Sequence, residues 1–175
     1  MKMRWLLTPF LASMVLLYGC VNEARDRNDE QEEMVVSESI EDEFTAVDTV
    51  DVEIRALGNN MREMSYDQEQ ITVPAGSVVR VTMVNEGEDA SMVHNVVFVE
   101  KGKMEQIAQA GIRAGVEQEY VPDNPVVIAH SGLVQPGETK KFSFTAPAAG
   151  TYEFVCTFPG HWQKMNGTFT VTANG

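Results

Sequence analysis

The sequence predicts an all-β fold, a β-sandwich of Greek-key type with about eight short strands and one helical insertion. From residue 50 onward, apolar and polar residues alternate over short runs, and glycine and proline separate these runs. Residues 103–114 break the pattern, because they contain few β-branched residues and space their apolar residues at helical intervals. Many short strands joined by turns are typical of a sandwich.

Each predicted strand is a run of β-branched or aromatic residues bounded by turn residues. The longest run, Ser-Val-Val-Arg-Val-Thr-Met-Val-Asn at residues 77–85, directly follows the turn Pro74-Ala75-Gly76. The predicted strands cover residues 50–54, 71–73, 77–85, 95–100, 126–130, 139–145, 150–156 and 167–172. Together with the helix at 103–114, which we expect to cover one side of the sandwich, they form one domain at residues 50–175.

Residues 1–19 have the features of a signal peptide of the lipoprotein type. Lys2 and Arg4 precede an apolar run at residues 5–17 that is too short to span a membrane as a helix. Gly19-Cys20 resembles the cleavage box of bacterial lipoproteins, in which the cysteine becomes the lipidated first residue. Ordinary cleavage nearby and an uncleaved anchor are the alternatives. In each case we expect export, to the periplasm or to the outer face of the cell membrane, with lipidation of Cys20 favoured.

Residues 20–49 are predicted to be a disordered acidic tether. The chain has a net charge of −13, and residues 22–53 alone contain 13 acidic and two basic residues. Large apolar residues are few there, so the segment has little to bury. A coil of about 30 residues has an end-to-end distance of about 30 Å. The acidic balance also argues against a nucleic-acid partner, which needs a basic surface.

Residues 156–165, Cys-Thr-Phe-Pro-Gly-His-Trp-Gln-Lys-Met, place a thiol, an imidazole and a thioether between two predicted strands. Cys156 is the only cysteine besides Cys20, so lipidation would leave it without a disulfide partner. Taken singly, a buried cysteine, a solvated loop histidine and a core methionine are ordinary. Two histidines, one cysteine and a weak methionine ligand together form a blue-copper electron-transfer site. The spacing therefore predicts copper bound by Cys156, His161 and Met165.

The second histidine ligand is either His94 or His130, the two other histidines of the chain. Both lie beside predicted strands. His94 is followed by Asn95, whose side chain is suited to hold a ligand loop by hydrogen bonds. His130 is followed by Ser131-Gly132, a pattern more typical of a surface corner. The residues alone favour His94 and leave His130 open.

Several segments, in the same order along the chain, resemble the azurins, small bacterial blue-copper proteins of the cupredoxin family. The resemblance covers about residues 50–174, including the helical insertion, and omits the tether. It implies a cupredoxin-like fold and one copper ion of type 1. The matching segments are Val50-Asp51-Val52, Gly58-Asn59, Ile71-Thr72-Val73, Met92 to Asn95, Val127 to His130, Gly137-Glu138 and Cys156 to His161.

By position, the resemblance implies that His94, Cys156 and His161 are the equatorial copper ligands and Met165 the axial one. It matches His130 to a histidine that does not bind copper in that family. The resemblance therefore resolves a choice that the residues left open.

The resemblance also implies roles for residues around the ligands. Asn95 corresponds to a residue that ties the ligand loops together, and the backbone N–H of Phe158 to one that hydrogen-bonds the thiolate. Azurins have a glycine before the first histidine ligand, with its carbonyl near copper, whereas this chain has Val93. A β-branched residue there predicts a site closer to four-coordinate, as in plastocyanin or the auracyanins. The azurin disulfide is also absent, because the domain has one cysteine.

The predicted function is one-electron transfer by an exported, membrane-tethered carrier that cycles between Cu(II) and Cu(I). Electrons are expected to pass through an exposed edge of His161, surrounded by an apolar docking patch. The predicted patch contains Met64, Met92, Phe158, Pro159 and Trp162. The expected partners are redox proteins such as cytochromes, reductases or a photosynthetic or respiratory complex, together with the membrane that holds the lipid anchor.

Two other functions are compatible with a copper site. A nitrite reductase or multicopper oxidase needs a second copper centre with more histidines, and this chain has three in all. A copper chaperone or storage protein without an electron-transfer role is the second alternative. The ten methionines are scattered along the chain rather than clustered, which favours a carrier over a store. We therefore expect a one-electron carrier and not an enzyme.

Overall fold

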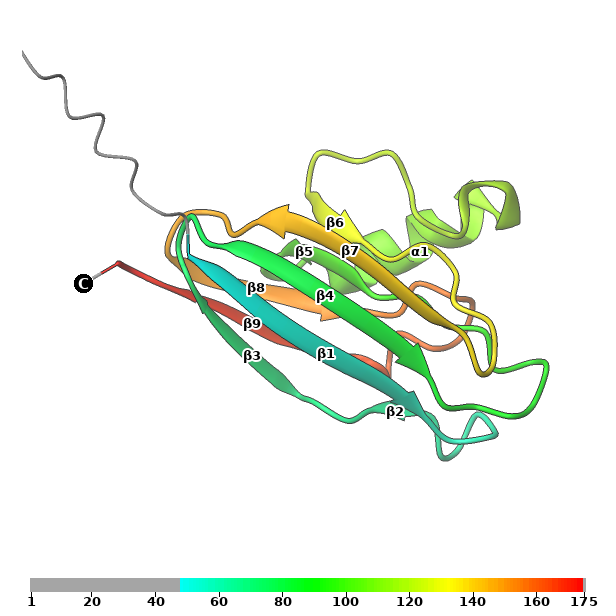
Figure 1. Cartoon of the computed structure of the whole chain (residues 1–175). Coiled ribbons are helices and arrows are strands. Elements are labelled where there is room, and N and C mark those ends of the chain that lie inside the picture. The colour runs from blue at the N-terminus through cyan, green and yellow to red at the C-terminus, as the bar shows by residue number, and fades with distance from the viewer. Residues whose placement is uncertain (1–47, 175) are drawn as a thin grey trace, which may run out of the picture. The chain divides into compact units, whose positions relative to one another are not determined.

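The computed structural model describes residues 48–174, and the predicted signal peptide, Cys20 and almost all of the predicted tether lie outside this range. Nine strands, one α-helix and one 3₁₀ helix form within it (Figure 1). They are β1 (Thr49–Leu57), β2 (Ser65–Tyr66), β3 (Gln70–Pro74), β4 (Val78–Asn85), β5 (Val97–Glu100), α1 (Met104–Ala114), η1 (Val116–Gln118), β6 (Val127–His130), β7 (Thr139–Thr145), β8 (Gly150–Val155) and β9 (Asn166–Thr172).

The strands form two sheets, ordered β2-β1-β4-β7 and β3-β9-β8-β5-β6. Most neighbours are antiparallel, but β1 pairs with β4 and β3 with β9 in parallel. In β4, every second residue from Val79 to Asn85 is buried, as expected for a strand with one face on a core. The predicted sandwich with about eight strands and one helical insertion is confirmed. Within residues 48–174, the two-residue β2 and the 3₁₀ helix η1 were not predicted.

The core between the sheets is apolar and rich in aromatic residues. Phe98 is fully buried, and its ring lies 5.0–6.3 Å, centroid to centroid, from four other phenylalanine rings. These rings belong to Phe142, Phe144, Phe154 and Phe169. Buried aromatic side chains contribute large apolar areas and favour such tilted contacts. Cys156, the one cysteine of the described residues, is free, so this packing holds the sandwich together without a disulfide.

Helix α1 packs on the outer face of the second sheet, as predicted for the insertion (Figure 1). Ile107 and Ala108 are buried on one side of the helix, and Ile107 clusters with Val97, Val99 and Val155 of the sheet. Gly111 lies against the backbone carbonyl of Tyr120, where a larger residue would not fit. The helix therefore holds the segment that follows it close to the sheet.

The loops that carry the predicted ligands lie at one end of the sandwich, which we call the ligand end. Here β4 ends at Asn85, β8 ends at Val155 and β9 begins at Asn166. The start of β1 at Thr49 pairs with the start of β4, so the chain enters the sandwich at the opposite end (Figure 1). Strands of six to eight residues separate the two ends by roughly 20–26 Å.

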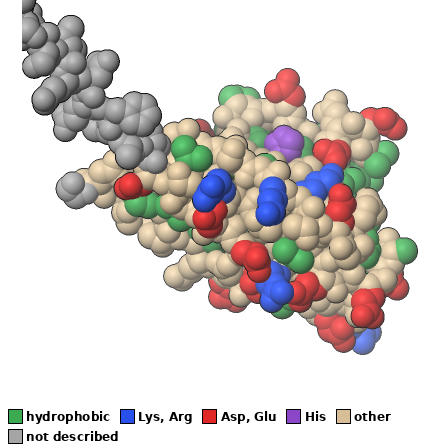
Figure 2. Space-filling model, viewed as in Figure 1, with side chains coloured by type: hydrophobic (Ala, Val, Ile, Leu, Met, Phe, Trp, Pro, Cys, Tyr) green, Lys and Arg blue, Asp and Glu red, His purple; other side chains and the backbone are tan. Residues whose placement is uncertain are grey.

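Charged side chains of both signs are mixed over the face of the sandwich shown in Figure 2. Among them, the guanidinium of Arg80 on β4 forms two 2.8 Å hydrogen bonds with the carboxylate of Asp51 on β1. Within residues 48–174, no helix is long and apolar enough to cross a membrane.

Candidate metal centre

The loop between β8 and β9 is held in a compact turn by its own backbone. The Cys156 N–H donates to the Met165 carbonyl over 2.9 Å, which closes the loop at its base. At its tip, the His161 N–H donates to the Phe158 carbonyl over 3.1 Å, and the Met165 N–H donates to the His161 carbonyl over 3.0 Å. All three predicted ligands of this loop are buried, with at most 1% of each residue exposed.

The segment that carries His94 is held from two sides. His94 forms an isolated β-bridge with Val134, with backbone hydrogen bonds of 3.2 and 2.7 Å. The buried side chain of Asn85 donates to the carbonyls of Met92 and Val134, over 2.7 and 3.0 Å. One amide group thus fixes the backbone on both sides of the bridge, and the His94 ring faces the Cys156 loop.

His94, Cys156 and His161 converge on one point. The two Nδ1 atoms lie 3.1 Å apart, and the Cys156 Sγ lies 4.0 Å from that of His94 and 3.8 Å from that of His161. With bond lengths of about 2.0 Å to nitrogen and 2.3 Å to sulfur, a planar trigonal metal site separates its nitrogens by about 3.5 Å and each from sulfur by about 3.7 Å. The ligand atoms therefore already lie close to the positions that a trigonal metal ion requires.

Burial sets the protonation of these groups in the metal-free chain. It lowers the pKa of His94 to about 4, with a further contribution from His161, and lowers the pKa of His161 to about 4. Both rings are therefore neutral at pH 7, the form that binds a metal. Burial raises the pKa of the Cys156 thiol to about 11. A bound cation would reverse this and deprotonate the thiol.

Three polar groups near the sulfur of Cys156 oppose the effect of its burial on the pKa of the thiol. The backbone N–H groups of Asn95 and Phe158, and then the hydroxyl of Tyr66, lower the pKa of the thiol. The N–H of Phe158 is the one expected from the resemblance. The donors of Asn95 and Tyr66 were not predicted. The two backbone N–H groups favour negative charge on the sulfur, as a thiolate ligand needs. The hydrogen of the Tyr66 hydroxyl is donated to the Asn95 carbonyl.

Asn95 connects the two ligand segments through its side chain. Its amide oxygen accepts from the Thr157 N–H and its amide nitrogen donates to the Thr157 hydroxyl, each over 2.8 Å. The same nitrogen donates to the Glu119 carbonyl over 3.1 Å. Because Asn95 follows His94 and Thr157 follows Cys156, these bonds fix the separation of two ligands. Asn95 thus joins the segment of His94 to the segment of Cys156.

The segment after η1 adopts an uncommon backbone conformation beside the site. Glu119 and Tyr120 are consecutive non-glycine residues with positive φ, 52° and 56°. Such conformations cost free energy and persist where surrounding contacts hold them. The contacts are the Asn95 side chain on the Glu119 carbonyl, and the Tyr120 ring on Phe158, with centroids 5.2 Å apart.

Three of the predicted exposures are wrong. Met64 and Met92, which were expected on the docking patch, are each 3% exposed, and His161 is 1% exposed. Met64 precedes β2, and its side chain belongs to the main core between the sheets. The His161 ring is covered by the rings of Phe158 and His94, with centroids 4.8 and 4.9 Å away. Because both loops fold inward over the ligands, solvent reaches the loop surface and not the imidazole.

The outer surface above His161 contains a different methionine. Met61 is 47% exposed, and its Cε would lie 3.1 Å from a Cβ added to Gly160. Phe158, Pro159 and Trp162 are half-buried, so they contribute apolar surface beside it. We call Met61, Phe158, Pro159 and Trp162 the apolar surface. Met61 lies in a loop between Asn60 and Arg62, and nothing in the sequence indicated that it would lie on this surface.

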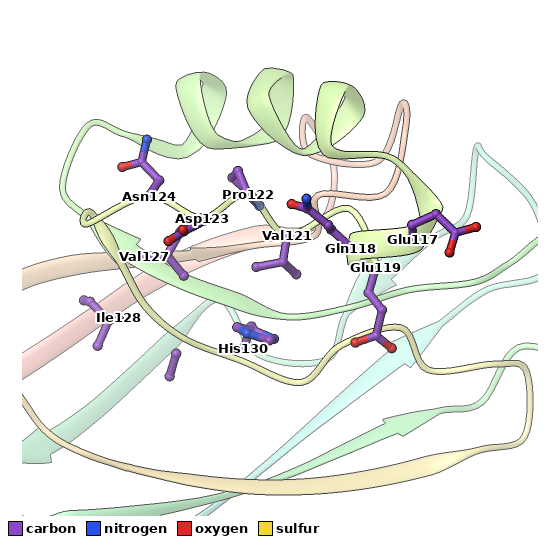
Figure 3. A pocket seen from close by; sticks show the side chains of 11 residues that line it. Glu117, Gln118, Glu119, Val121, Pro122, Asp123, Asn124, Val127, Ile128 and His130 are labelled. Carbon is purple, nitrogen blue, oxygen red and sulfur yellow. The ribbon is translucent and has the colours of Figure 1, made fainter. Parts of the chain in front are cut away.

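His130 lies apart from the three clustered ligands. It ends β6 and is exposed, and its Nδ1 accepts a hydrogen bond from the Gly132 N–H over 3.2 Å. Its ring lines an open pocket of about 510 Å³ with Glu117, Glu119 and Asp123, below helix α1 in Figure 3. Within residues 48–174, the cluster that could hold a metal consists of His94, Cys156 and His161. The choice of His94 over His130 agrees with this placement.

The sequence and the fold are similar to those of known copper proteins. The family described as copper binding proteins, plastocyanin/azurin family, matches residues 52–172. Auracyanin-A of Chloroflexus aurantiacus is 40% identical over 118 residues, 66% of this chain and 72% of the relative. Azurin of Pseudomonas putida is 31% identical over 126 residues, 68% of this chain and 98% of the relative. Sodium dithionite-reduced auracyanin from Roseiflexus castenholzii matches with a TM-score of 0.64 and 33% identity, over 71% of this chain and 98% of that one.

Proposed function

Because the chain belongs to the plastocyanin/azurin family of copper-binding proteins, we propose that it is an exported, membrane-tethered electron carrier. The cupredoxin fold and a type 1 copper as cofactor are confirmed. The observation that carries the proposal is the convergence of two imidazole nitrogens and one sulfur within 4.8 Å, in residues that are at most 1% exposed. Members of this family are blue-copper electron carriers rather than enzymes.

Copper supplies a centre that gains and loses one electron, and the protein keeps the surroundings of that centre constant. His94 and His161 are neutral and buried, and the backbone N–H groups of Asn95 and Phe158 lower the pKa of the buried Cys156 thiol. The backbone bonds within each loop, and the Asn95 side chain between the loops, leave the ligands little freedom. Little rearrangement on electron transfer favours a fast reaction.

We further propose Met165 as the axial ligand. It is fully buried, and its backbone is bonded to both Cys156 and His161, so its side chain starts beside the three clustered ligands. Val93, on the other side of His94, is half-buried. With valine where the azurins have glycine, we propose a four-coordinate site. A distance from copper to the Val93 carbonyl short enough for bonding would contradict this.

Electrons enter and leave, in our proposal, through the apolar surface above His161. Its residues surround the loop tip, and a small apolar contact suits brief docking. The test uses self-exchange between oxidised and reduced copies of this protein, so no partner has to be identified. Trp162→Glu places like charges opposite each other when two copies meet, and we expect self-exchange to fall about tenfold or more at low ionic strength.

The matched control is Ala148→Glu, an exposed residue between β7 and β8 at the opposite end of the sandwich. It adds the same charge far from the ligands and should leave the self-exchange rate unchanged. Equal rates for the wild type and Trp162→Glu would show that electrons do not pass through the apolar surface.

The point at which the chain enters the domain supports tethering through Cys20 in this proposal. The chain enters the domain at Thr49, at the end opposite the ligands, so a lipid on Cys20 would leave the ligand end free to meet partners. Cytochromes, reductases and respiratory or photosynthetic complexes are the proposed partners. Replacing Cys20 with serine should move the full-length protein from the membrane fraction to the soluble one. Retention in the membrane fraction would contradict lipid anchoring at Cys20.

A copper chaperone or store is the alternative function. A chaperone hands its metal to another protein, which requires ligands that a partner can reach. The three clustered ligands here are buried beneath the loops, which favours retention of copper. Reversible redox cycling with copper retained would distinguish the carrier from the chaperone.

A further inference from the structure

Glu119 contacts two segments of the ligand end through two different groups. Its backbone carbonyl accepts a hydrogen bond from the Asn95 side chain over 3.1 Å, and its carboxylate oxygen Oε1 accepts one from the Leu133 N–H over 3.1 Å. The Glu119 side chain points from the segment after η1 toward the loop that follows β6 (Figure 3). Glu119 therefore joins the segment of Asn95 to the loop of residues 131–138.

The backbone at both ends of the carboxylate contact is unusual. Glu119 has a φ of 52°, a conformation that glycine adopts more easily, but glycine has no carboxylate. On the other side, Gly132 has a φ of 66°, and a side chain at this position would collide with the Glu119 carboxylate. A glutamate where the backbone favours glycine, facing a glycine that leaves room for it, indicates that this contact has a purpose.

The two contacts of Glu119 complete a closed set of links around His94. Leu133 precedes Val134, whose backbone is bonded to that of His94 by hydrogen bonds of 2.7 and 3.2 Å. Asn95 follows His94 and donates to the Glu119 carbonyl, which closes the set. We call these five residues the His94 brace. Two of its links depend on side chains, those of Asn95 and Glu119.

We propose that Glu119 is a positioning residue that retains copper in the site by closing the His94 brace. The proposal rests on the proposed function as a copper electron carrier. Cys156, His161 and Met165 lie on one loop, whereas His94 is the one proposed ligand from another segment. Movement of His94 away from that loop opens the site and releases copper. The brace opposes this movement, because it fixes the backbone on both sides of His94.

The hydrogen bond to Leu133, and not the charge of Glu119, carries this role. Leu133 is buried, so loss of the carboxylate leaves its N–H without this partner. The carboxylate also lies 3.5 Å from the Nζ of Lys140, but both side chains of this pair are partly exposed, and such pairs contribute little. Glutamine keeps an oxygen that can accept from Leu133 and removes the charge. Glu119→Gln and Glu119→Ala therefore separate the two effects.

The test is the rate at which the copper-loaded protein loses Cu(II) to an excess of EDTA, followed by the thiolate-to-copper band. Residues that hold metal ligands in place typically change metal affinity by about 10- to 100-fold. Because Glu119 is half-exposed, we expect the lower value, a release about tenfold faster in Glu119→Ala. Glu119→Gln should release copper at nearly the wild-type rate. An unchanged rate in Glu119→Ala, or an equally fast release in Glu119→Gln, would overturn the proposal.

The matched control is Glu138→Ala, which removes the same charge from the same end of the domain. The Glu138 carboxylate also accepts from a backbone N–H, that of Gln135, over 2.8 Å, but it lies outside the His94 brace. Its removal should leave copper release unchanged. An equal rise in Glu138→Ala and Glu119→Ala would assign the effect to charge or to general loosening of the loop, and would overturn the proposal.

Hydrogen exchange of the Leu133 amide in the metal-free chain is a second readout, which also serves if Glu119→Ala does not fold. This amide should exchange slowly in the wild type and in Glu119→Gln, and faster in Glu119→Ala. A wild-type amide that exchanges as fast as an exposed one would overturn the proposal. A wild type that stays colourless with copper would overturn the proposed function itself, whereas a blue wild type with no effect at Glu119 would overturn this inference alone.

Discussion

The aromatic core and the ligand end are both buried, but they are built in different ways. Around Phe98, five phenylalanine rings fill the space between the sheets by shape and volume. The ligand end also buries five polar residues, and nearly every one is bonded to a specific partner. They are Asn85, His94, Asn95, Thr157 and His161. The core therefore contributes mainly to stability, whereas the hydrogen bonds at the ligand end mainly fix the positions of the ligand atoms.

A substitution in the core should separate stability from copper chemistry most strongly. Phe98→Ala leaves a cavity among four rings, and we expect a loss of about 3–5 kcal/mol in the free energy of unfolding. Denaturant unfolding of the metal-free protein measures it. The copper spectrum of the folded fraction should stay the same, because the aromatic contacts of Phe98 are with other phenylalanines and not with the copper ligands. A changed spectrum would show that the two regions are coupled.

Acid should lower the stability of the metal-free protein through the buried histidines of the ligand end, and not through the apolar core. The buried histidines have a pKa of about 4 in the folded chain, below the value of about 6.5 in the unfolded chain. Between these values the unfolded state binds more protons, so the stability of the metal-free protein falls as pH decreases from about 6.5 to 4. The loss should reach a few kcal/mol and level off for these groups below pH 4.

Two variants test the origin of this acid slope. His94→Gln removes one of the buried imidazoles and should reduce the slope, whereas His130→Gln changes an exposed residue outside the cluster and should leave it intact. Unfolding of each protein at pH 7, 5.5 and 4.5 gives the comparison. An equal slope in His94→Gln and the wild type would mean that other groups cause the acid sensitivity.

Asn85 tests how far hydrogen bonds alone support the ligand end. Asn85→Ala leaves the carbonyls of Met92 and Val134 without their side-chain donor, which should cost about 1–3 kcal/mol. Because these carbonyls flank the His94 bridge, the copper spectrum should change as well. Arg80→Ala, which breaks the exposed pair with Asp51, is the control and should alter neither property measurably. Loss of stability with an unchanged spectrum would assign Asn85 to the fold alone.

The strands and the helix could be predicted because their patterns are local. Short runs of β-branched and aromatic residues between turns indicate strands, and β2 was missed because two residues show no such pattern. The ligand spacing in residues 156–165 was also local. The exposure of Met64, Met92 and His161 could not be predicted, because it depends on how two distant loops fold over each other.

The polar residues that hold the ligands differ in how visible they are in the sequence. Asn85 follows Val79, Val81 and Met83 at intervals of two, so it falls on the buried face of its strand. A polar residue on that face is a signal that a hydrogen-bonded site is near. Tyr66 gives no comparable signal, because its hydroxyl donates to the carbonyl of Asn95, which lies 29 residues away in the sequence.

The most direct test of the account is a titration of the metal-free wild type with Cu(II), followed by absorption. We predict one equivalent of copper and an intense thiolate-to-copper band, which Cys156→Ser lacks and His130→Ala retains. A wild type that stays colourless, or a band that survives in Cys156→Ser, would contradict a copper site built on His94, Cys156 and His161.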